Sequence, residues 1–371
     1  MTRIATIEDI IDDARNGRPF ILVDADDREN EGDIVIPAQF ATPERIAHMA
    51  THARGLICLA ITAQRAAQLE LEQMSRDNRS GHGTAFTVSI EAAQGVTTGI
   101  SAFDRARTIS VAINPANGPD DIVTPGHVFP LVARDGGVLI RAGHTEAAVD
   151  VSRLAGLMPA GVICEIMNPD GTMARLPDLL PFAERHGLKI GTIADLIAYR
   201  RKSEKLVQLV VRAPFETHFG DGFFIQVYRD LIDRAEHVAL VRGHIRPEGE
   251  TLVRVHQVDL TADMLGYKHA HRDYVSRMLE RLASHDGPSV AVFVRDPDPE
   301  SISRRVQGGR QDYSNRYGSR DYGIGAQILR DLGVTRMNLL TSSSGKMAAL
   351  EGFGLEVTGR TPIIEETGEA A

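Results

Sequence analysis

The stretch VDADDRENEGD, residues 23–33, gathers six carboxylate side chains around a single arginine, Arg28. A charge run of this kind is usually a solvated turn. The order of the residues also fits a site in which Arg28 holds an anionic or hydroxyl-rich substrate, while Glu29 and Glu31 ligate a metal or move protons. A calcium-binding loop is excluded, because the sixth residue counted from Asp24 is Glu29, where the sharp turn requires glycine.

Two segments combine hydroxyl groups and arginine with an expected helix start. In TTGISAFDRA, residues 97–106, Ser101 is the expected helix cap and Arg105 follows it. In RAGHTEA, residues 141–147, Thr145 takes the position of the cap. Backbone N–H groups at a helix N-terminus bind phosphate together with hydroxyls and arginine. The sequence therefore predicts two anion sites, although an arginine taken alone is more often a surface charge.

Two further segments place a proton-transfer group beside apolar residues. His127 follows the Pro–Gly turn of TPGHVFPL, and Glu165 lies inside the apolar run GVICEI. An unpaired buried carboxylate is costly, so Glu165 should be paired, bound to metal or protonated with a raised pKa. The plainer alternatives are a hydrogen-bonded loop histidine and a buried ion pair with a core arginine. Three more histidines are expected to be structural: His48, His52 and His82.

The composition limits the class of protein. The 371 residues are 43% hydrophobic and 25% charged, which is typical of a soluble globular chain long enough for two domains. A formal net charge of −9 argues against nonspecific nucleic-acid binding as the main task. No apolar run approaches the roughly 20 residues that cross a bilayer, so no membrane segment is expected.

The N-terminus and the cysteines indicate a cytoplasmic protein. The first residues, MTRIATIEDIIDDARNG, carry acids and helical periodicity, unlike a secretory signal. Cys58 and Cys164 are the only cysteines, and both lie in apolar stretches. We expect them to be reduced thiols in a hydrophobic core.

Short strand-type runs alternate with amphipathic helices over the first half, which predicts a mixed sheet with helices packed around it. Helices are expected to begin at Thr42, Ser101 and Thr145. Beyond a basic, polar joint at Lys202–Lys205 the strands become longer, and helices return at residues 271–285 and 323–333. Strands in the first half are expected at Phe20–Val23, Leu56–Thr62, Ala85–Ile90 and Gly161–Ile166.

The motifs of the first half are specific when their order is considered. DRENEGD, GTAFTVSI, TTGISAFDR, TPGHVFPL, RAGHTEA and CEIM follow one another along the chain. This order strongly resembles that of 3,4-dihydroxy-2-butanone 4-phosphate synthase of riboflavin biosynthesis, over roughly Ile4 to Arg200. In that family the acidic loop is part of the active site.

The resemblance implies a lyase that converts D-ribulose 5-phosphate to L-3,4-dihydroxy-2-butanone 4-phosphate and formate, using magnesium or manganese. It implies that Glu29 and His144 are metal ligands, and that His127 and Glu165 are essential to the chemistry. Cys58 matches a family position close to the substrate. The residues implied to contact substrate are Arg28, Glu29, Asp33, Arg141, Ala142, Gly143, His144, Thr145 and Glu165.

The implied reaction begins with removal of a proton next to a carbonyl, then loses water and shifts the carbon skeleton. The enediolate needs positive charge beside its oxygens, which a metal supplies. It also needs a base and an acid within hydrogen-bond reach. The residue that takes the first proton is left open by the sequence.

From about Val207 to Ile364 the chain resembles a GTP cyclohydrolase II domain, in segments such as HVALVRGHI, LVRVHQVDLTADML and YGIGAQILRDLGV. That family builds a zinc site from three cysteines. Their positions fall here on Asp259, His269 and His271, and the second half has no cysteine. The family stretches RQEGR and TNNP are replaced by VRDPDPESISRRV and by TSSS, residues 341–344.

We therefore predict an α+β protein with a synthase domain at residues 1–203 and an α/β cyclohydrolase II-like domain at residues 204–371. The second domain is expected to be inactive and to hold no zinc. A cytoplasmic homodimer that acts on a phosphorylated sugar is expected, with no nucleic-acid or membrane partner. Two alternatives remain: a bifunctional enzyme that still opens GTP, and a GTP-sensing module that adjusts the synthase.

Overall fold

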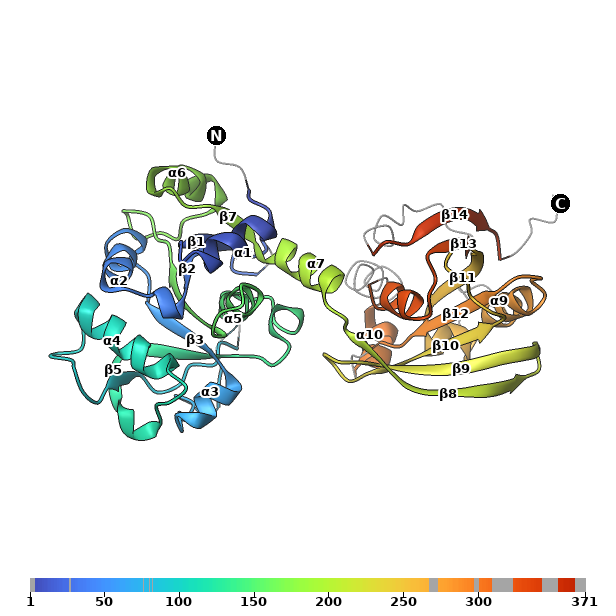
Figure 1. Ribbon diagram of the computed structural model, residues 1–371, viewed down its shortest axis with the longest axis horizontal. Coiled ribbons are helices and arrows are strands. Elements are labelled where there is room, and N and C mark those ends of the chain that lie inside the picture. Colours follow the sequence, from blue (N-terminus) through green and yellow to red (C-terminus); the bar gives the residue numbers. More distant parts are fainter. Residues whose placement is uncertain are drawn as a thin grey trace. The chain divides into compact units, whose positions relative to one another are not determined.

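A computed structural model describes residues 4–26, 28–75, 77–79, 81, 83–266, 273–296, 300–308, 323–341 and 353–363 of the chain. The chain divides into two compact units, Met1–Arg200 and Arg201–Ala371 (Figure 1). Each unit has hydrophobic cores of its own. In this described part of the chain, no helix is both long and apolar enough to span a membrane.

The first unit is built on one seven-stranded sheet with the strand order β4-β5-β3-β6-β2-β1-β7. β3 runs parallel to β5 and β1 parallel to β7, whereas the other neighbouring pairs are antiparallel. The predicted mixed sheet of an α+β protein is confirmed. The strands are β1 (Phe20–Val23), β2 (Gly32–Pro37), β3 (Cys58–Thr62), β4 (Ile90–Ala92), β5 (Ile122–Ala133), β6 (Ala160–Glu165) and β7 (Ile190–Thr192).

Helices cover both faces of this sheet, which explains why β1 is an uninterrupted apolar run (Figure 1). Ile21 of β1 packs with α2, α4 and α6 on one face, and Leu22 packs with α1, α5 and α7 on the other. The α-helices are α1 (Ile7–Arg15), α2 (Pro43–His48), α3 (Ala63–Gln68), α4 (Ala102–Ile113), α5 (His144–Leu154), α6 (Leu176–His186) and α7 (Ile193–Ser203). The short turns are η1 (Ala38–Phe40), the π-helical η2 (Met49–Ala53), η3 (Pro119–Asp121) and η4 (Gly137–Leu139).

Polar side chains begin two helices where the sequence predicts them. Ser101 accepts a hydrogen bond from Asp104 N (3.0 Å) at the start of α4, and Thr42 immediately precedes α2. The prediction for Thr145 is wrong, because α5 begins one residue earlier, at His144. Thr145 therefore lies within the first turn of α5.

The predicted strand Ala85–Ile90 is wrong in its extent. β4 begins only at Ile90, and Phe86 makes a single bridge to Leu131. Val88 N donates instead to the carbonyl of Glu72 (3.0 Å), in an irregular segment. Thr87 N donates to the carbonyl of Pro130 in β5 (3.0 Å), so the backbone of this apolar run is divided between β5 and a loop and forms no regular ladder.

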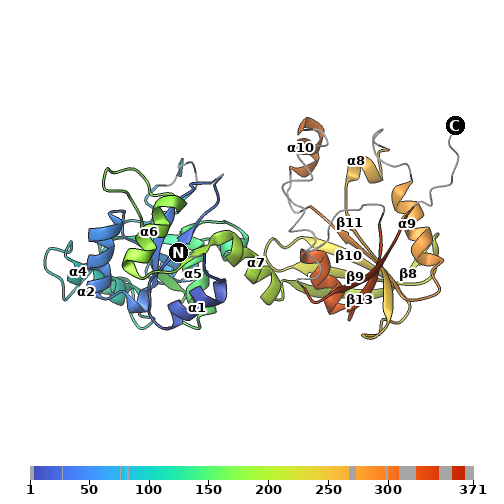
Figure 2. The same ribbon diagram turned by 90° about the horizontal axis from the view of Figure 1, so that it is seen from above.

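The second unit has its own seven-stranded mixed sheet, in the order β14-β13-β11-β12-β10-β9-β8. Strands β8 to β10 and β12 pair antiparallel, and β12, β11, β13 and β14 pair parallel. Helix α9 packs on one face and the helix at residues 323–331 on the other (Figure 2). Its strands are β8 (Val207–Thr217), β9 (Gly220–Asp230), β10 (Glu236–Arg242), β11 (Glu250–Gln257), β12 (Ser289–Val294), β13 (Arg336–Leu340) and β14 (Glu356–Thr361), and its named helices are α8 (Leu260–Asp263), α9 (Tyr274–Ala283) and α10 (Ser301–Gly308).

A buried ion pair fastens α7 to the first unit. Arg200 is only 4% exposed and donates to Asp150 Oδ2 of α5 (2.8 Å) and to the carbonyl of Gly136 (2.7 Å). Val138 N donates to the same Asp150 oxygen (2.8 Å). Burial raises the pKa of Asp150, and the charge of Arg200 opposes that rise. Loss of Arg200 would therefore leave a buried carboxylate with only the more distant Arg153 (3.7 Å) as a counter-charge.

We expect Arg200→Ala to lower the free energy of unfolding of the first unit by about 3–5 kcal/mol, the usual cost of breaking a buried ion pair. Urea denaturation followed by circular dichroism measures the change. The matched control is Arg15→Ala, which removes an exposed ion pair with Asp12 (3.9 Å) and should cost less than about 1 kcal/mol. Equally small losses in both variants would contradict the prediction.

Candidate active site

The acidic loop between β1 and β2 is organised by its first carboxylate. Asp24 is 5% exposed and accepts hydrogen bonds from Arg28 (2.7 Å), Glu29 N (3.1 Å) and Glu31 N (2.8 Å). Arg28 also donates to Glu29 Oε2 (2.5 Å). From the start of α6, Arg175 donates to the Glu29 carbonyl (2.5 Å). The loop is therefore held by specific contacts and is not merely a solvated turn.

This loop brings Glu29 to His144, the first residue of α5. One ligand atom each of Asp24, Glu29 and His144 lies within 4.8 Å of the other two. His144 Nε2 donates to the carbonyl of Leu22 (3.1 Å), since a carbonyl oxygen can only accept. Burial lowers the pKa of His144, which favours the neutral ring with its lone pair on Nδ1. Glu29 and His144 thus present a carboxylate and an imidazole nitrogen to a cation, while both oxygens of the adjacent Asp24 already accept hydrogen bonds.

Asp33 is a buried carboxylate at the start of β2. It is 2% exposed, and its Oδ1 has no hydrogen bond and lies 3.7 Å from His144 Nδ1. Burial, followed by the negative charges of Glu165 and its neighbours in the loop, raises the pKa of Asp33 well above the ordinary range. When Asp33 is ionised, its Oδ1 and His144 Nδ1 are two facing acceptors, an arrangement that a bound cation satisfies. The residues present therefore fit a metal ion.

Glu165 ends β6, on the strand beside Asp33. Its Oε2 accepts a hydrogen bond from Leu56 N (2.8 Å). A Cβ atom added to Gly55 would lie 2.6 Å from the same oxygen, so this close approach requires glycine. Of the possibilities that the sequence left open for Glu165, the structure shows pairing, with a backbone amide as the partner.

The two cysteines are buried near this carboxylate. Cys58 is 2% exposed and Cys164 is 0% exposed, which confirms the predicted core position. Burial, and then the charge of Glu165, raises the pKa of both thiols. At neutral pH neither cysteine is therefore suited to act as a thiolate nucleophile.

His127 lies in β5 and is oriented by a carboxylate that sequence reasoning missed. Its Nδ1 is 2.8 Å from Glu91 Oε2 of β4, and Thr108 Oγ1 donates to the other Glu91 oxygen (3.4 Å). Glu91 is 9% exposed. A carboxylate oxygen accepts, so the ring donates from Nδ1 and keeps Nε2 for proton transfer. The available signal was a single acid in the apolar run VSIEAA, the same kind of signal that marked Glu165.

Two of the predicted residues share one face of the sheet. Asp33 and Glu165 each lie two residues along a strand from a side chain that packs in the core under α5, and such positions face the same way. The two core side chains are Val35 and Ile163. His144 approaches this same face from α5.

The pairing register sets the spacing of these groups. Phe129 pairs with Cys58 of β3, and Cys58 pairs with Ile163 of β6. His127 and Glu165 lie two residues beyond this row, toward the same edge of the sheet. Two strand spacings put their backbones about 10 Å apart. A small sugar phosphate has the size to lie between them.

Arg141 lies just before α5 and is not a surface charge. Its side chain is 15% exposed and donates to Glu146 Oε2 (2.7 Å) and to Thr84 Oγ1 (3.0 Å). Thr145, in the first turn of α5, is buried as well. The first N–H groups of an α-helix lack intrahelical partners and attract anions. The segment from Arg141 to Thr145 can therefore receive a phosphate next to His144.

The predicted anion site in TTGISAFDRA is wrong. Asp104 accepts hydrogen bonds from Thr97 N (3.1 Å), Thr97 Oγ1 (2.8 Å) and Gly99 N (3.0 Å). A carboxylate of the protein itself thus takes the donors that a phosphate would need. Arg105 has a buried Nε without a hydrogen-bond partner, and burial lowers its pKa.

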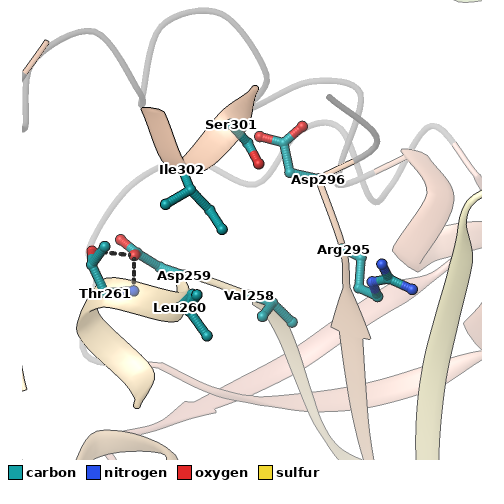
Figure 3. Close-up of a pocket in the computed structure, with 8 residues that line it drawn as sticks. All are labelled: Val258, Asp259, Leu260, Thr261, Arg295, Asp296, Ser301 and Ile302. Carbon is teal, nitrogen blue, oxygen red and sulfur yellow. Dashed lines mark hydrogen bonds between the residues drawn. The ribbon is translucent and has the colours of Figure 1, made fainter. Parts of the chain in front are cut away.

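In the second unit, Asp259 caps a helix. Its Oδ1 accepts hydrogen bonds from Thr261 N (3.0 Å), Thr261 Oγ1 (2.6 Å) and Ala262 N (3.2 Å) at the start of α8 (Figure 3). The adjacent cavity has a volume of about 240 Å³, and Arg295 on its border points away from Asp259. The other residues of the predicted zinc and TSSS positions, His269, His271 and 342–344, lie outside the described residues.

The fold and the site define a class of protein in which a mixed sheet carries carboxylates and histidines toward one edge. The chain matches the family model of 3,4-dihydroxy-2-butanone 4-phosphate synthase over residues 8–199, and that of GTP cyclohydrolase II over residues 208–362. The chain belongs to the 3,4-dihydroxy-2-butanone 4-phosphate synthase family.

Relatives and solved structures agree with this assignment. The riboflavin biosynthesis protein RibBA of Aquifex aeolicus is 49% identical over 96% of this chain and 92% of its own length. The crystal structure of RibBX, a two-domain 3,4-dihydroxy-2-butanone 4-phosphate synthase from A. baumannii, is 44% identical, with a TM-score of 0.78 over 96% of this chain and 99% of that one. A synthase in complex with two magnesium ions is 42% identical, with a TM-score of 0.52 over 54% of this chain and 98% of that one.

We expect Asp33→Asn to stabilise the protein in the presence of a chelator. In the unfolded chain the Asp33 carboxyl ionises near pH 3.9, roughly its ordinary pKa, whereas the folded protein keeps the proton to higher pH. The free energy of unfolding of the wild type therefore falls as the pH rises from about 4 toward the raised pKa of Asp33. That of the Asp33→Asn variant does not fall for this reason. The variant should gain at least about 1 kcal/mol at neutral pH and almost nothing below about pH 4.

Urea denaturation at several pH values measures this difference. The control is Asp12→Asn, in which the replaced side chain is 53% exposed. A stability difference for Asp33→Asn that does not change with pH would show that its carboxyl ionises normally in the folded protein.

Proposed function

We propose that this chain is a lyase of riboflavin biosynthesis that converts D-ribulose 5-phosphate to L-3,4-dihydroxy-2-butanone 4-phosphate and formate. The observation that carries the proposal is the cluster of Asp24, Glu29 and His144, which adjoins the carboxylates of Asp33 and Glu165. The reaction removes a proton next to a carbonyl and passes through charged oxygens. A cation and well-placed proton-transfer groups are what such intermediates require.

Glu29 and His144 are the proposed ligands of a magnesium or manganese ion, and Asp24 belongs to the same cluster. The related synthase complex with two magnesium ions supports this choice, as carboxylate ligands suit both metals. When bound, the ion supplies positive charge to the oxygens of an enediolate. The Leu22 carbonyl keeps the His144 lone pair on Nδ1, and Asp24 keeps the Glu29 backbone in place.

Glu165 and His127 are the proposed proton-transfer groups. Glu165 is fixed by Leu56 N, and His127 by Glu91. With its Nδ1–H donated to Glu91, a neutral His127 ring accepts a proton at Nε2. The two groups lie toward the same edge of the sheet, so each can serve a different end of the reacting carbon chain.

The phosphate is proposed to bind at the start of α5, away from the reacting carbons. Arg141 supplies a guanidinium there, and Thr145 a hydroxyl beside free backbone N–H groups. Binding energy from the phosphate would orient the sugar toward the metal cluster. The full set of proposed substrate contacts is Arg28, Glu29, Asp33, Arg141, Ala142, Gly143, His144, Thr145 and Glu165.

We also propose that the protein is a cytoplasmic homodimer. Large apolar side chains of the first unit are exposed around α4 and the start of β5: Ile100 is 55% exposed, Phe103 71% and Val123 48%. A second copy would remove such surface from water. Two buried cysteine thiols suit a reducing compartment.

The synthase domain is proposed to span residues 1–203, and residues 204–371 are proposed to form a domain that neither hydrolyses GTP nor holds zinc for that reaction. The three donors on Asp259 Oδ1 support the proposal, because a carboxylate oxygen committed to a helix cap is a poor replacement for a zinc-bound thiolate. The lack of any cysteine in this half supports it as well.

Glu29→Gln and His144→Ala should each abolish formate release from ribulose 5-phosphate while leaving the circular dichroism spectrum unchanged. Chelation of the wild type should have the same effect, and magnesium or manganese should restore activity. Glu44→Gln, which changes an exposed carboxylate of α2, is the control. Full activity after verified removal of metal would eliminate the proposed metal role.

His127→Ala and Glu165→Gln should each lower the turnover rate at least about 100-fold, the usual scale of a general acid–base contribution. Glu91→Gln should lower it less, about 10-fold, since His127 remains but is held in place less firmly. His218→Ala, in the second unit, is the control. If both His127→Ala and Glu165→Gln kept rates within a few-fold of wild type, these side chains would have only a structural role.

The purified chain should release formate from ribulose 5-phosphate but none from GTP, with zinc, magnesium or manganese supplied. Without strong zinc ligands nothing lowers the pKa of the attacking water far enough at neutral pH. A GTP-dependent formate signal that disappears in the variant Asp259→Ala, His269→Ala would establish a bifunctional enzyme. GTP binding without turnover would indicate a sensing module instead.

A further inference from the structure

Three histidines of the first unit converge at a place that the proposed lyase reaction does not use. One ring nitrogen each of His48, His52 and His186 lies within 4.8 Å of the other two. Their ring centroids are 4.7–5.0 Å apart, and His48 Nε2 is 3.2 Å from His186 Nδ1. All three side chains are half-buried, so an ion from solvent can reach them.

The backbone brings the three rings together from two elements. His48 ends α2 and His52 lies four residues later in the π-helical turn η2, a spacing that puts both rings on one side of the helix. His186 is the last residue of α6, which Gly187 ends with a left-handed conformation. Single π-helical turns inside helical segments are frequent at functional sites.

The distances suit a tetrahedral metal site. Zn–N bonds of about 2.0–2.1 Å place two nitrogen ligands about 3.3 Å apart, and the His48 and His186 nitrogens already have that separation. Burial, followed by the neighbouring histidines, lowers the pKa of His48 and His186, which favours the neutral rings that ligate metal. A cavity of about 430 Å³ borders His52 and His186 and leaves room for a water ligand.

We propose that His48, His52 and His186 bind a divalent transition-metal ion of the zinc class, and that this ion joins the end of α2 to the end of α6. Three imidazole ligands suit zinc far better than magnesium. The inference replaces the expectation that His48 and His52 are only structural, and it stands independently of the proposed lyase activity.

The site is next to backbone that supports Glu165. Ala53, which follows His52, accepts a hydrogen bond from Met167 N (2.9 Å). Arg54 donates to the carbonyls of His52 (2.8 Å) and Met167 (2.9 Å). Two residues after Arg54 is Leu56, whose backbone N–H donates a hydrogen bond to Glu165. An ion that fastens His52 to α6 would therefore also restrain the segment that positions Glu165.

An anion is the competing ligand, because Arg54 and Arg185 border the same cavity. Binding of an anion would require protonated histidines, whereas the lowered pKa values favour neutral rings. The close pair of His48 and His186 nitrogens also requires that at least one of them be unprotonated. The contacts thus favour a cation.

The test is zinc titration of the chelator-stripped full chain by calorimetry, in excess magnesium to saturate the carboxylate cluster, with bound zinc counted by atomic absorption. His186→Phe keeps a ring against Phe182 but removes the ligand, and should weaken zinc binding at least about 100-fold. His52→Ala should do the same. His186→Cys supplies a thiolate ligand and should retain the ion.

Two controls separate this site from other histidines. His218→Ala, and the combined variant Asp259→Ala, His269→Ala, His271→Ala, should leave the zinc affinity of the triad unchanged. Zinc should raise the melting temperature of the wild type but not of His186→Phe. If His186→Phe does not fold, His52→Ala decides the question. Zinc binding that is equal in wild type, His186→Phe and His52→Ala would overturn the proposal, as would phosphate binding that depends on the triad in the absence of zinc binding.

Discussion

The conformation of the acidic loop depends on the buried carboxylate of Asp24. The five carboxylates between β1 and β2 repel one another, and Ala25 is the only apolar residue of that loop. Asp24 offsets this repulsion by accepting hydrogen bonds from Arg28 and from the backbone of Glu29 and Glu31. The loop then folds over the end of β1, where Glu29 meets His144. The contacts of Asp24, together with the hydrogen bond from Arg175 to the Glu29 carbonyl, hold the candidate metal cluster in place.

Much of the site is predictable from the sequence, because its motifs are short and their order is specific. Glu29 and His144, which the motifs single out, do lie together. Glu91 and Arg175 were missed, because their partners are distant along the chain and only the folded sheet reveals them. The phosphate site at Ser101 was predicted wrongly for a related reason. Hydroxyls before a helix also suit an internal carboxylate, and Asp104 fills that role.

The strands of the fold are predictable where the backbone N–H and C=O groups of an apolar run pair within a regular β-ladder. Phe20–Val23 is an example, since a short run buried on both faces has few alternatives to a central strand. Ala85–Ile90 has a similar composition, yet its amides bond partly to β5 and partly to a loop. The order of the strands in the sheet cannot be predicted from local sequence patterns. β3, for example, lies between β5 and β6, which come much later in the sequence. In the sequence, Asp259 stands where the related family has a zinc-binding cysteine. Only the structure shows that its side chain caps α8.

The last turn of α7 has a consequence for dividing the protein into pieces. Arg200 is held by Asp150, whereas the carbonyls of Arg201 and Glu204 accept hydrogen bonds from the Gln327 amide (2.8 and 3.0 Å). The two sets of anchors belong to different compact units, although they are adjacent along the chain. Cleavage between Arg200 and Arg201 would leave each set with its own unit, whereas cleavage after Ser203 would separate the Arg201 carbonyl from Gln327. Fragments meant to fold separately should therefore divide between Arg200 and Arg201, or overlap by residues 201–203.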